Sequence, residues 1–265
     1  MASPLGTAPG RPASTTLKKH KGGNTLVRIR IAELNIEIDN RYSFTEKFCR
    51  EFLAEFAVPD LKIAVTDADI AAERAADPYH NDEGYLECIC VYRAIALALA
   101  RFDAMVFHAA VIAYEGRAVA FAAHSGTGKS THIALWQGVF GDKVTVINGD
   151  KPIFRRIDGV WYAFGTPWRG KESLGANLSA PLHAICFLER GSENTVSAVG
   201  DDVAVARLFS QTLLPTDPVM ADKHLSLLDD LIVKTPTYLL YCNMEPGAAH
   251  VAHDGLLKGN GYEKK

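Results

Sequence analysis

The chain has 265 residues, of which 48% are hydrophobic and 22% are charged. These fractions are typical of a soluble globular protein and exclude a mostly disordered, collagen-like or coiled-coil chain. With 28 basic and 31 acidic residues, the net charge is −3 at pH 7, which argues against a protein that coats nucleic acid but leaves a local basic pocket open.

The five cysteines show no regular spacing and no Cys-x-x-Cys pair. Neither a disulfide framework nor a thiolate zinc site is therefore indicated, and free thiols favour a reducing compartment. The longest apolar run, residues 94–100, is far too short to cross a bilayer. We predict a cytoplasmic protein that binds neither nucleic acid nor membranes.

The N-terminal third begins with a tail, residues 1–24, that is rich in small residues, proline and lysine, which predicts disorder. Apolar and polar residues then alternate over residues 26–38 with one slip at Ala32–Glu33, which predicts two strands or one strand with a turn or bulge. Phenylalanines spaced four residues apart predict a helix with an aromatic core face: Phe44, Phe48, Phe52 and Phe56. The other elements expected here are a strand at 61–65 and helices at 67–76 and 86–101.

Strand patterns dominate from residue 105 onward. Residues 105–114 and 117–123 flank the turn signal Glu115–Gly116 and predict a hairpin that leads into a glycine-rich loop and a helix. Residues 153–156 and 160–164 flank Asp158–Gly159, a strong hairpin turn signal. Further strands are expected at 143–147, 184–188 and 238–242, and helices at 202–214 and 221–233.

Residues 123–131 read Ala-His-Ser-Gly-Thr-Gly-Lys-Ser-Thr and fit the phosphate-loop pattern, with alanine in place of the first glycine. The glycines let backbone amides approach phosphate oxygens, Lys129 adds a positive charge, Ser130 can ligate Mg²⁺, and the following helix adds its positive end. An ordinary glycine-rich turn is the alternative, but the predicted strand before the motif and helix after it favour a phosphate loop. The predicted nucleotide-binding residues are Ser125, Gly126, Thr127, Gly128, Lys129, Ser130 and Thr131.

A second polar element follows the strand predicted at 143–147, where the chain reads Asn148-Gly149-Asp150. Open α/β sheets bind ligands at the carboxyl ends of their strands. Asp150 could ligate Mg²⁺ or accept a proton from an attacking hydroxyl. A turn aspartate without function is the alternative, and the phosphate loop upstream favours function.

Residues 165–172 contain a tryptophan, two cations and a carboxylate, a set that suits recognition of a phosphate, a nucleotide or a peptide. The alternative is a packed surface loop with solvated charges. We predict that Arg169 and Lys171 lie near the active site and contact substrate.

The loop Ser-Gly-Thr-Gly-Lys-Ser at 125–130, the short spacing to Gly149–Asp150, and His108 one strand upstream resemble HPr kinase/phosphorylase. That fold is shared with phosphoenolpyruvate carboxykinase, and the resemblance covers residues 108–188. It implies that His108 lies beside the transferred phosphate, that Lys129 and Ser130 are phosphate and metal ligands, and that Asp150 is the catalytic acid/base. Without the resemblance, a core histidine in an apolar strand would be an equal interpretation of His108.

The chain departs from that family at four places. Ala123 replaces the first loop glycine, Thr131 the acidic residue after the loop serine, and Lys151 the second of two consecutive aspartates. The stretch that serves dephosphorylation is reduced at most to Arg169–Gly170. The expected acceptor is therefore another hydroxyl than that of HPr. Small relatives act beside peptide-modifying systems, and one phosphorylates a C-terminal serine of a lasso-peptide precursor.

The leading prediction is an ATP-dependent serine kinase-like phosphotransferase that uses Mg²⁺ and acts on a Ser/Thr hydroxyl of a peptide or protein. Asp150, His108 and Lys129 are the predicted catalytic residues, and Ser130 and Asp150 the predicted metal ligands. One alternative is a non-catalytic nucleotide-gated binding or escort protein for a peptide. Another is a small-molecule phosphotransferase of the carboxykinase type.

The expected fold is α/β with a mixed sheet, in which an HPr kinase/carboxykinase-like P-loop core is joined to a smaller N-terminal α+β region. The predicted boundaries are 1–24 for a disordered tail, 25–103 for the N-terminal region, 104–258 for the kinase-like domain and 259–265 for a disordered C-terminus. The resemblance is also compatible with a homo-oligomer.

Overall fold

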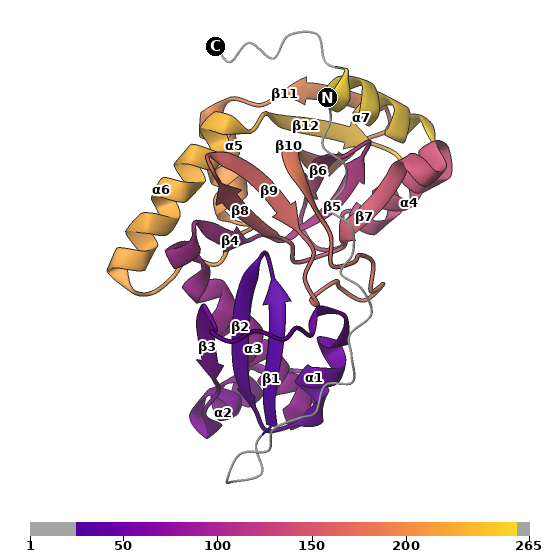
Figure 1. Ribbon diagram of the computed structural model, residues 1–265. Helices are drawn as coiled ribbons and strands as arrows, with labels where there is room; N and C mark the ends of the chain where they lie inside the picture. Colours follow the sequence, from indigo (N-terminus) through magenta and orange to yellow (C-terminus); the bar gives the residue numbers. More distant parts are fainter. Residues whose placement is uncertain (1–24, 259–265) are drawn as a thin grey trace. The chain divides into compact units, whose positions relative to one another are not determined.

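The structure is a computed structural model that describes residues 25–258, so the two predicted disordered ends, 1–24 and 259–265, lie outside the described residues. The described chain divides into two compact units, residues 25–98 and 99–258 (Figure 1). The division into an N-terminal region and a kinase-like domain, as a statement about function, stays a prediction.

The first unit is a three-stranded sheet with helices. Its strands are β1 (Thr25–Ile31), β2 (Leu34–Asn40) and β3 (Leu61–Ala64), with β2 antiparallel to β1 and parallel to β3. The break in the alternating pattern is a tight turn, because Ala32 and Glu33 both have positive φ, 50° and 60°. The prediction of two strands joined by a turn is confirmed.

The helices of this unit are α1 (Ser43–Phe48), the short 3₁₀ helix η1 (Arg50–Phe52), α2 (Asp67–Ala76) and α3 (Glu83–Ala98). The predicted α2 is confirmed, and Thr66 and Asp69 form a capping box at its start. The predicted helix through four phenylalanines is wrong. The backbone leaves the α conformation at Cys49, so Phe56 lies outside any helix, and Phe48 is 38% exposed whereas Phe52 is 1% exposed.

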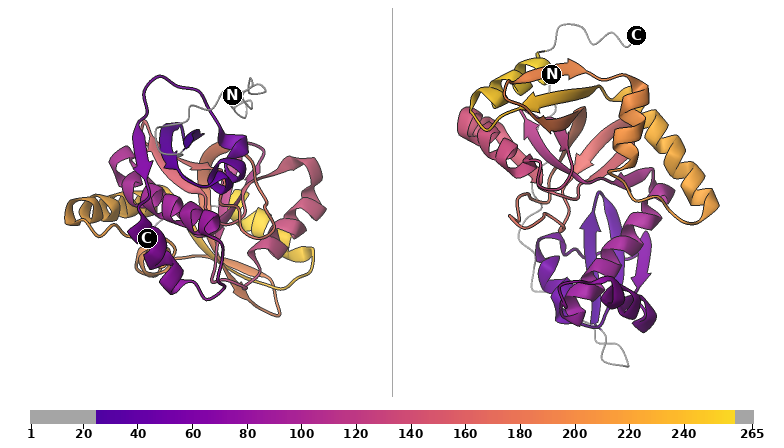
Figure 2. Two further views of the ribbon diagram at one scale, coloured as in Figure 1. Left: turned by 90° about the horizontal axis from the view of Figure 1, so that it is seen from below. Right: turned by 180° about the vertical axis from the view of Figure 1, so that it is seen from behind.

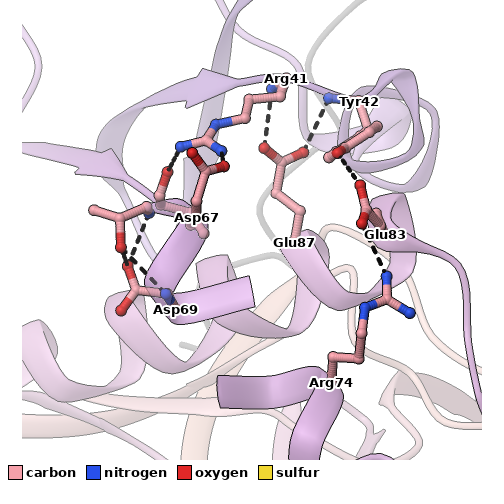
Figure 3. A network of polar contacts seen from close by, with 9 residues as sticks. Arg41, Tyr42, Asp67, Asp69, Arg74, Glu83 and Glu87 are labelled. Atoms are coloured by element: carbon pink, nitrogen blue, oxygen red, sulfur yellow. Dashed lines mark hydrogen bonds and ion pairs between the residues drawn. The ribbon is translucent and has the colours of Figure 1, made fainter. Parts of the chain in front are cut away.

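A network of polar contacts connects the β2–α1 junction to α2 and α3 (Figure 3). Glu87 on α3 accepts hydrogen bonds from the backbone N–H groups of Arg41, at 2.9 Å, and Tyr42, at 3.1 Å. The Arg41 side chain pairs with Asp67 at the start of α2. Glu87 itself is 0% exposed, so its carboxylate takes the place of water as the hydrogen-bond acceptor for two backbone N–H groups that precede α1.

The second unit is built on a nine-stranded mixed sheet with the strand order β4-β8-β9-β10-β6-β5-β7, and β12 pairs with both β10 and β11. These strands are β4 (Ala104–Val106), β5 (Ala109–Tyr114), β6 (Arg117–Ala122), β7 (Val144–Asn148), β8 (Ile153–Ile157), β9 (Val160–Phe164), β10 (Ser179–Arg190), β11 (Thr195–Ala198) and β12 (Thr237–Cys242). Strand β10 runs parallel to β6 and β12, whereas β5 is antiparallel to β6 and β7. The predicted α/β fold with a mixed sheet is confirmed.

Helices cover both faces of this sheet. The helices α5 (Asp201–Phe209) and α6 (Pro218–Lys234) lie on one side, and α4 (Lys129–Phe140) and α7 (Gly247–Leu257) lie on the other (Figures 1 and 2). Alternate residues of β5 enter the two cores: Val111 packs in the core that includes α5 and α6, and Ile112 in the core that includes α4 and α7. A strand buried on both faces is therefore apolar without a break.

One strand prediction is wrong in a way that bears on the site. Residues 105–114 were expected to form a single strand, but the chain breaks at Phe107–His108. The two parts pair with different neighbours, because β4 joins β8 and β5 joins β6 and β7. His108 therefore stands at a junction between strands, with 27% of its side chain exposed, and is not a core residue of a strand.

The remaining differences are at the C-terminal side. Helix α5 ends at Phe209, short of the predicted residue 214, while β11 and α7 were not predicted. Among the residues that the structure describes, no helix is long and apolar enough to cross a membrane.

Candidate functional site

The glycine-rich loop lies between β6 and α4. Gly126 has φ = 79° and Gly128 has φ = 125°, conformations that cost an L-residue strain and that glycine adopts freely. Helix α4 begins directly afterwards at Lys129, and the Thr127 N–H donates to the His124 carbonyl at 3.2 Å to close the turn. A strand, a loop and a helix thus follow one another as the phosphate-loop motif requires.

The Lys129 side chain folds back over the loop. Its Nζ donates to the Ala123 carbonyl at 3.0 Å and lies 3.1 Å from His108 Nε2. The residue is 9% exposed, and burial lowers the pKa of Lys129, helped by the Lys151 charge and opposed by Asp150. An ammonium group held with so little water around it is prepared to interact with an anion.

His108 Nε2 lies between a cation and an anion, 3.1 Å from Lys129 Nζ and 3.2 Å from Asp150 Oδ1. Nε2 cannot accept from the ammonium and donate to the carboxylate at once. Nε2 therefore has two alternative roles. Without a proton it accepts from Lys129, and with a proton it donates to Asp150. That is the arrangement of a group that can pass a proton.

Asp150 is held in place by the turn that precedes it. The Asn148 side-chain oxygen accepts from the backbone N–H groups of Asp150 and Lys151, both at 2.8 Å. Gly149 permits this turn because a Cβ atom there would lie 2.8 Å from the Arg169 carbonyl oxygen. Asn148, buried at the end of β7, thereby sets the direction of the carboxylate.

The charge state of Asp150 follows from its neighbours. Burial acts to raise the pKa of Asp150, but the hydrogen bond with His108 and the Lys151 ammonium 3.4 Å away outweigh burial, so the pKa is lowered. The group is therefore a carboxylate at neutral pH.

A cavity of about 430 Å³, here called the loop cavity, brings most of the predicted residues together. Its lining residues are His108, Ser125, Gly126, Gly128, Lys129, Ser130, Thr131, Gly149, Asp150, Gly170, Lys171 and Glu172. Of the predicted substrate residues, Lys171 lines this cavity. Arg169 does not, and its Nε donates to the Thr166 carbonyl at 3.3 Å.

The sequence prediction missed Arg190, at the end of β10. Its Nη2 donates to the Gly126 carbonyl at 2.6 Å and its Nε to the Thr127 carbonyl at 3.4 Å. These two hydrogen bonds stabilise the conformation of the glycine-rich loop. The rule that identified Asp150 could have found it, because Arg190 likewise stands at the carboxyl end of a buried strand.

A second cavity, of about 480 Å³ and here called the side cavity, lies next to the loop. Its lining residues are Gly126, Thr127, Gly128, Thr131, His132, Leu135, Arg190, Gly191, Cys242, Asn243 and Met244. It thus shares Gly126, Gly128 and Thr131 with the loop cavity. The sequence prediction identified none of its walls apart from the glycine-rich loop itself.

Comparisons with known proteins give three findings. No curated protein matches the chain. Among solved structures, that of the Hpr(Ser) kinase/phosphatase from Coxiella burnetii is similar over 58% of this chain and 97% of that chain, with 9% sequence identity and a TM-score of 0.37. The family model described as SynChlorMet cassette protein ScmC matches residues 76–213, just over half of the chain, and this span contains His108, Lys129 and Asp150. The chain belongs to the ScmC family of SynChlorMet cassette proteins.

Proposed function

We propose that this protein is an ATP-dependent phosphotransferase that phosphorylates a Ser/Thr hydroxyl of a peptide or protein. The observation that carries the proposal is the position of His108 Nε2 between Lys129 Nζ and Asp150 Oδ1, in the wall of the cavity that the glycine-rich loop lines. A cation for phosphate, a carboxylate for the acceptor proton and a histidine between them are the groups that phosphoryl transfer to a hydroxyl needs.

In this proposal Lys129 turns its ammonium to the phosphates, joined by the loop amides and the positive end of α4. His108, in the state that carries a proton on Nε2, donates to Asp150 and orients its carboxylate. Positioning and charge stabilisation supply most of the acceleration, because the transition state of phosphoryl transfer is loose.

The transfer step forms one bond to the γ-phosphorus and breaks another. The acceptor hydroxyl oxygen forms a bond to the γ-phosphorus, the bond from that phosphorus to the β,γ-bridging oxygen breaks, and ADP leaves. The hydroxyl proton passes to the Asp150 carboxylate. The lowered pKa of Asp150 suits a late proton transfer, because the hydroxyl becomes acidic only as its oxygen bonds to phosphorus.

The residues of the loop cavity fit Mg²⁺ in the form in which it accompanies a nucleotide. Mg²⁺ prefers oxygen ligands, keeps several waters and binds through one or two carboxylates together with substrate phosphates. Ser130 and Asp150 supply one hydroxyl and one carboxylate in the same cavity. In the described residues no cluster of three or more His, Cys, Asp or Glu side chains could hold a metal by itself. When bound, the ion neutralises charge on the phosphates.

The test is incubation with γ-labelled ATP, Mg²⁺ and cell extract, followed by locating the label among peptides, proteins, small molecules and free phosphate. We expect label on a peptide or protein, and we expect Lys129→Ala to lower its formation by about 10²–10³-fold, because a preorganised charge at the phosphates is lost. Lys143→Ala is the matched control, since Lys143 is an exposed lysine that pairs with Glu115 and lines neither cavity.

Transfer that survives in the folded Lys129→Ala variant would contradict the proposal. Label confined to ATP or free phosphate would instead favour a nucleotide-gated escort protein, and label on a small molecule would favour a carboxykinase-type phosphotransferase.

A further inference from the structure

The loop cavity and the side cavity differ in chemical character. The loop cavity contains Lys129, Asp150, Lys171 and Glu172. The walls of the side cavity include Leu135, Cys242 and Met244, and Met244 is 78% exposed. Its volume of about 480 Å³ lies within the range of small-molecule sites, about 300–1,000 Å³.

The histidine in the wall of the side cavity already has a hydrogen-bond partner inside the protein. The Trp136 indole N–H donates to His132 Nε2 at 3.0 Å. This nitrogen is therefore already in use as an acceptor. Arg190 is the one Lys or Arg residue in the lining of the side cavity, and its N–H groups are already directed to the loop carbonyls of Gly126 and Thr127.

The polar groups of Asn243, which also lines the side cavity, are engaged as well. The Asn243 side-chain oxygen accepts from the Glu245 N–H at 3.0 Å, and its amide nitrogen donates to the Ser192 carbonyl at 3.2 Å. The backbone N–H of Asn243 donates to the Asn194 side chain at 2.9 Å. This wall is thus fixed before any ligand arrives, and it favours a ligand held by stacking and shape.

Of these two cavities, the loop cavity contains His108 and Asp150, which are in contact with each other and could take a proton from an acceptor, and neither lines the side cavity. An acceptor hydroxyl must therefore enter the loop cavity. The side cavity is left for the part of the substrate that carries no reacting atom.

We infer that the side cavity binds the nucleoside half of the nucleoside triphosphate whose phosphates occupy the loop cavity. A nucleoside triphosphate has an anionic end and an uncharged heteroaromatic end, and the two cavities, joined at Gly126, Gly128 and Thr131, match these two ends. The Arg190 guanidinium plane and the Leu135 and Met244 side chains offer stacking and apolar contacts to a base. This inference rests on the proposed function.

The test compares two ligands that share the phosphates but not the nucleoside: ATP and inorganic triphosphate, each with Mg²⁺, titrated into the full chain by calorimetry. We expect Leu135→Trp, which fills the side cavity, to raise the Kd for ATP about tenfold and the Kd for triphosphate less than about twofold. Leu225→Trp is the matched control, because Leu225 is 40% exposed on α6 and lines neither cavity.

Equal losses for the two ligands, or an unchanged affinity for ATP in the folded Leu135→Trp variant, would overturn the inference and leave the proposed function standing. Failure of the wild-type protein to bind either ligand would overturn the proposed function and the inference with it.

A second measurement does not depend on any variant. Photolabelling with 8-azido-ATP, in competition with ATP, should place the label on peptides that contain residues 131–135, 190–191 or 242–244. ATP-protected label that falls only on other peptides would contradict the inference.

Discussion

Each unit of this protein has a half-buried or buried carboxylate next to a helix or strand end, and the two carboxylates are held in different ways. Glu87, in the N-terminal unit, is fully buried and accepts from two backbone N–H groups (Figure 3). Asp150, in the sheet unit, has 29% of its side chain exposed and interacts with the side chains of His108 and Lys151. Backbone donors fix a fold, whereas side-chain donors at a cavity can be exchanged for a ligand.

The pKa values of the two groups shift in opposite directions. Burial raises the pKa of Glu87, although its two backbone hydrogen bonds and Arg41 act to lower it. For Asp150 burial also acts to raise the pKa, but its histidine and lysine partners outweigh it and the pKa is lowered. The neighbours of a carboxylate thus indicate its role better than its burial does.

The largest expected effect is that of Asp150→Asn on phosphoryl transfer. The amide cannot accept the hydroxyl proton, so we expect the rate to fall by about 10²–10⁴-fold, while ATP affinity falls much less. We expect the free energy of unfolding to change by less than about 1 kcal/mol, because the ion pairs of Asp150 are partly exposed. Labelled transfer, ATP titration and urea unfolding measure the three quantities.

Asp254→Asn is the matched control for this variant, since Asp254 also pairs with a histidine, His253, at 2.8 Å, but lines neither cavity. An Asp150→Asn variant with full transfer activity would place Asp150 with Glu87 among the structural carboxylates.

The next effect is that of Glu87→Ala on stability. Two backbone N–H groups lose their acceptor inside the protein, and we expect the free energy of unfolding to fall by about 3 kcal/mol. Hydrogen exchange should rise first in peptides that cover residues 34–48. Transfer activity per folded molecule should stay unchanged, and a loss of activity without a loss of stability would reverse the comparison.

The smallest effect is a pH dependence that isolates the raised pKa of Glu87. The folded state binds the Glu87 proton more tightly than the unfolded state does, so this contribution to stability is fully present below the ordinary value of 4.5 and is lost as pH rises through the folded-state pKa. The free energy of unfolding of wild type relative to Glu87→Gln should therefore decrease as the pH rises above the ordinary value of 4.5. A difference that stays flat or increases with pH would show that the pKa of Glu87 is not raised.

Local sequence patterns predicted a large part of the fold. The turn at Ala32–Glu33, helix α2, the hairpin at Asp158–Gly159 and the strand–loop–helix around residues 123–131 are all present. The prediction failed where a short-range pattern competed with long-range pairing. The phenylalanines have a helical period of four, but the chain leaves the α conformation at Cys49, and Leu53 pairs with Ile29 of β1.

The sequence by itself predicted the glycine-rich loop, because residues adjacent in the chain form it and its glycines adopt φ values of 79° and 125° without strain. It also identified Lys129 and Asp150 as candidates. Only the tertiary structure decided that His108 leaves its strand to stand between them, because that depends on β4 and β5 pairing with different strands. The contact of Arg190 with the loop was decided in the same way. The parallel pairing of β10 with β6 brings Arg190 next to Gly126, which lies 64 residues earlier in the chain, and no local sequence pattern records a contact over that distance.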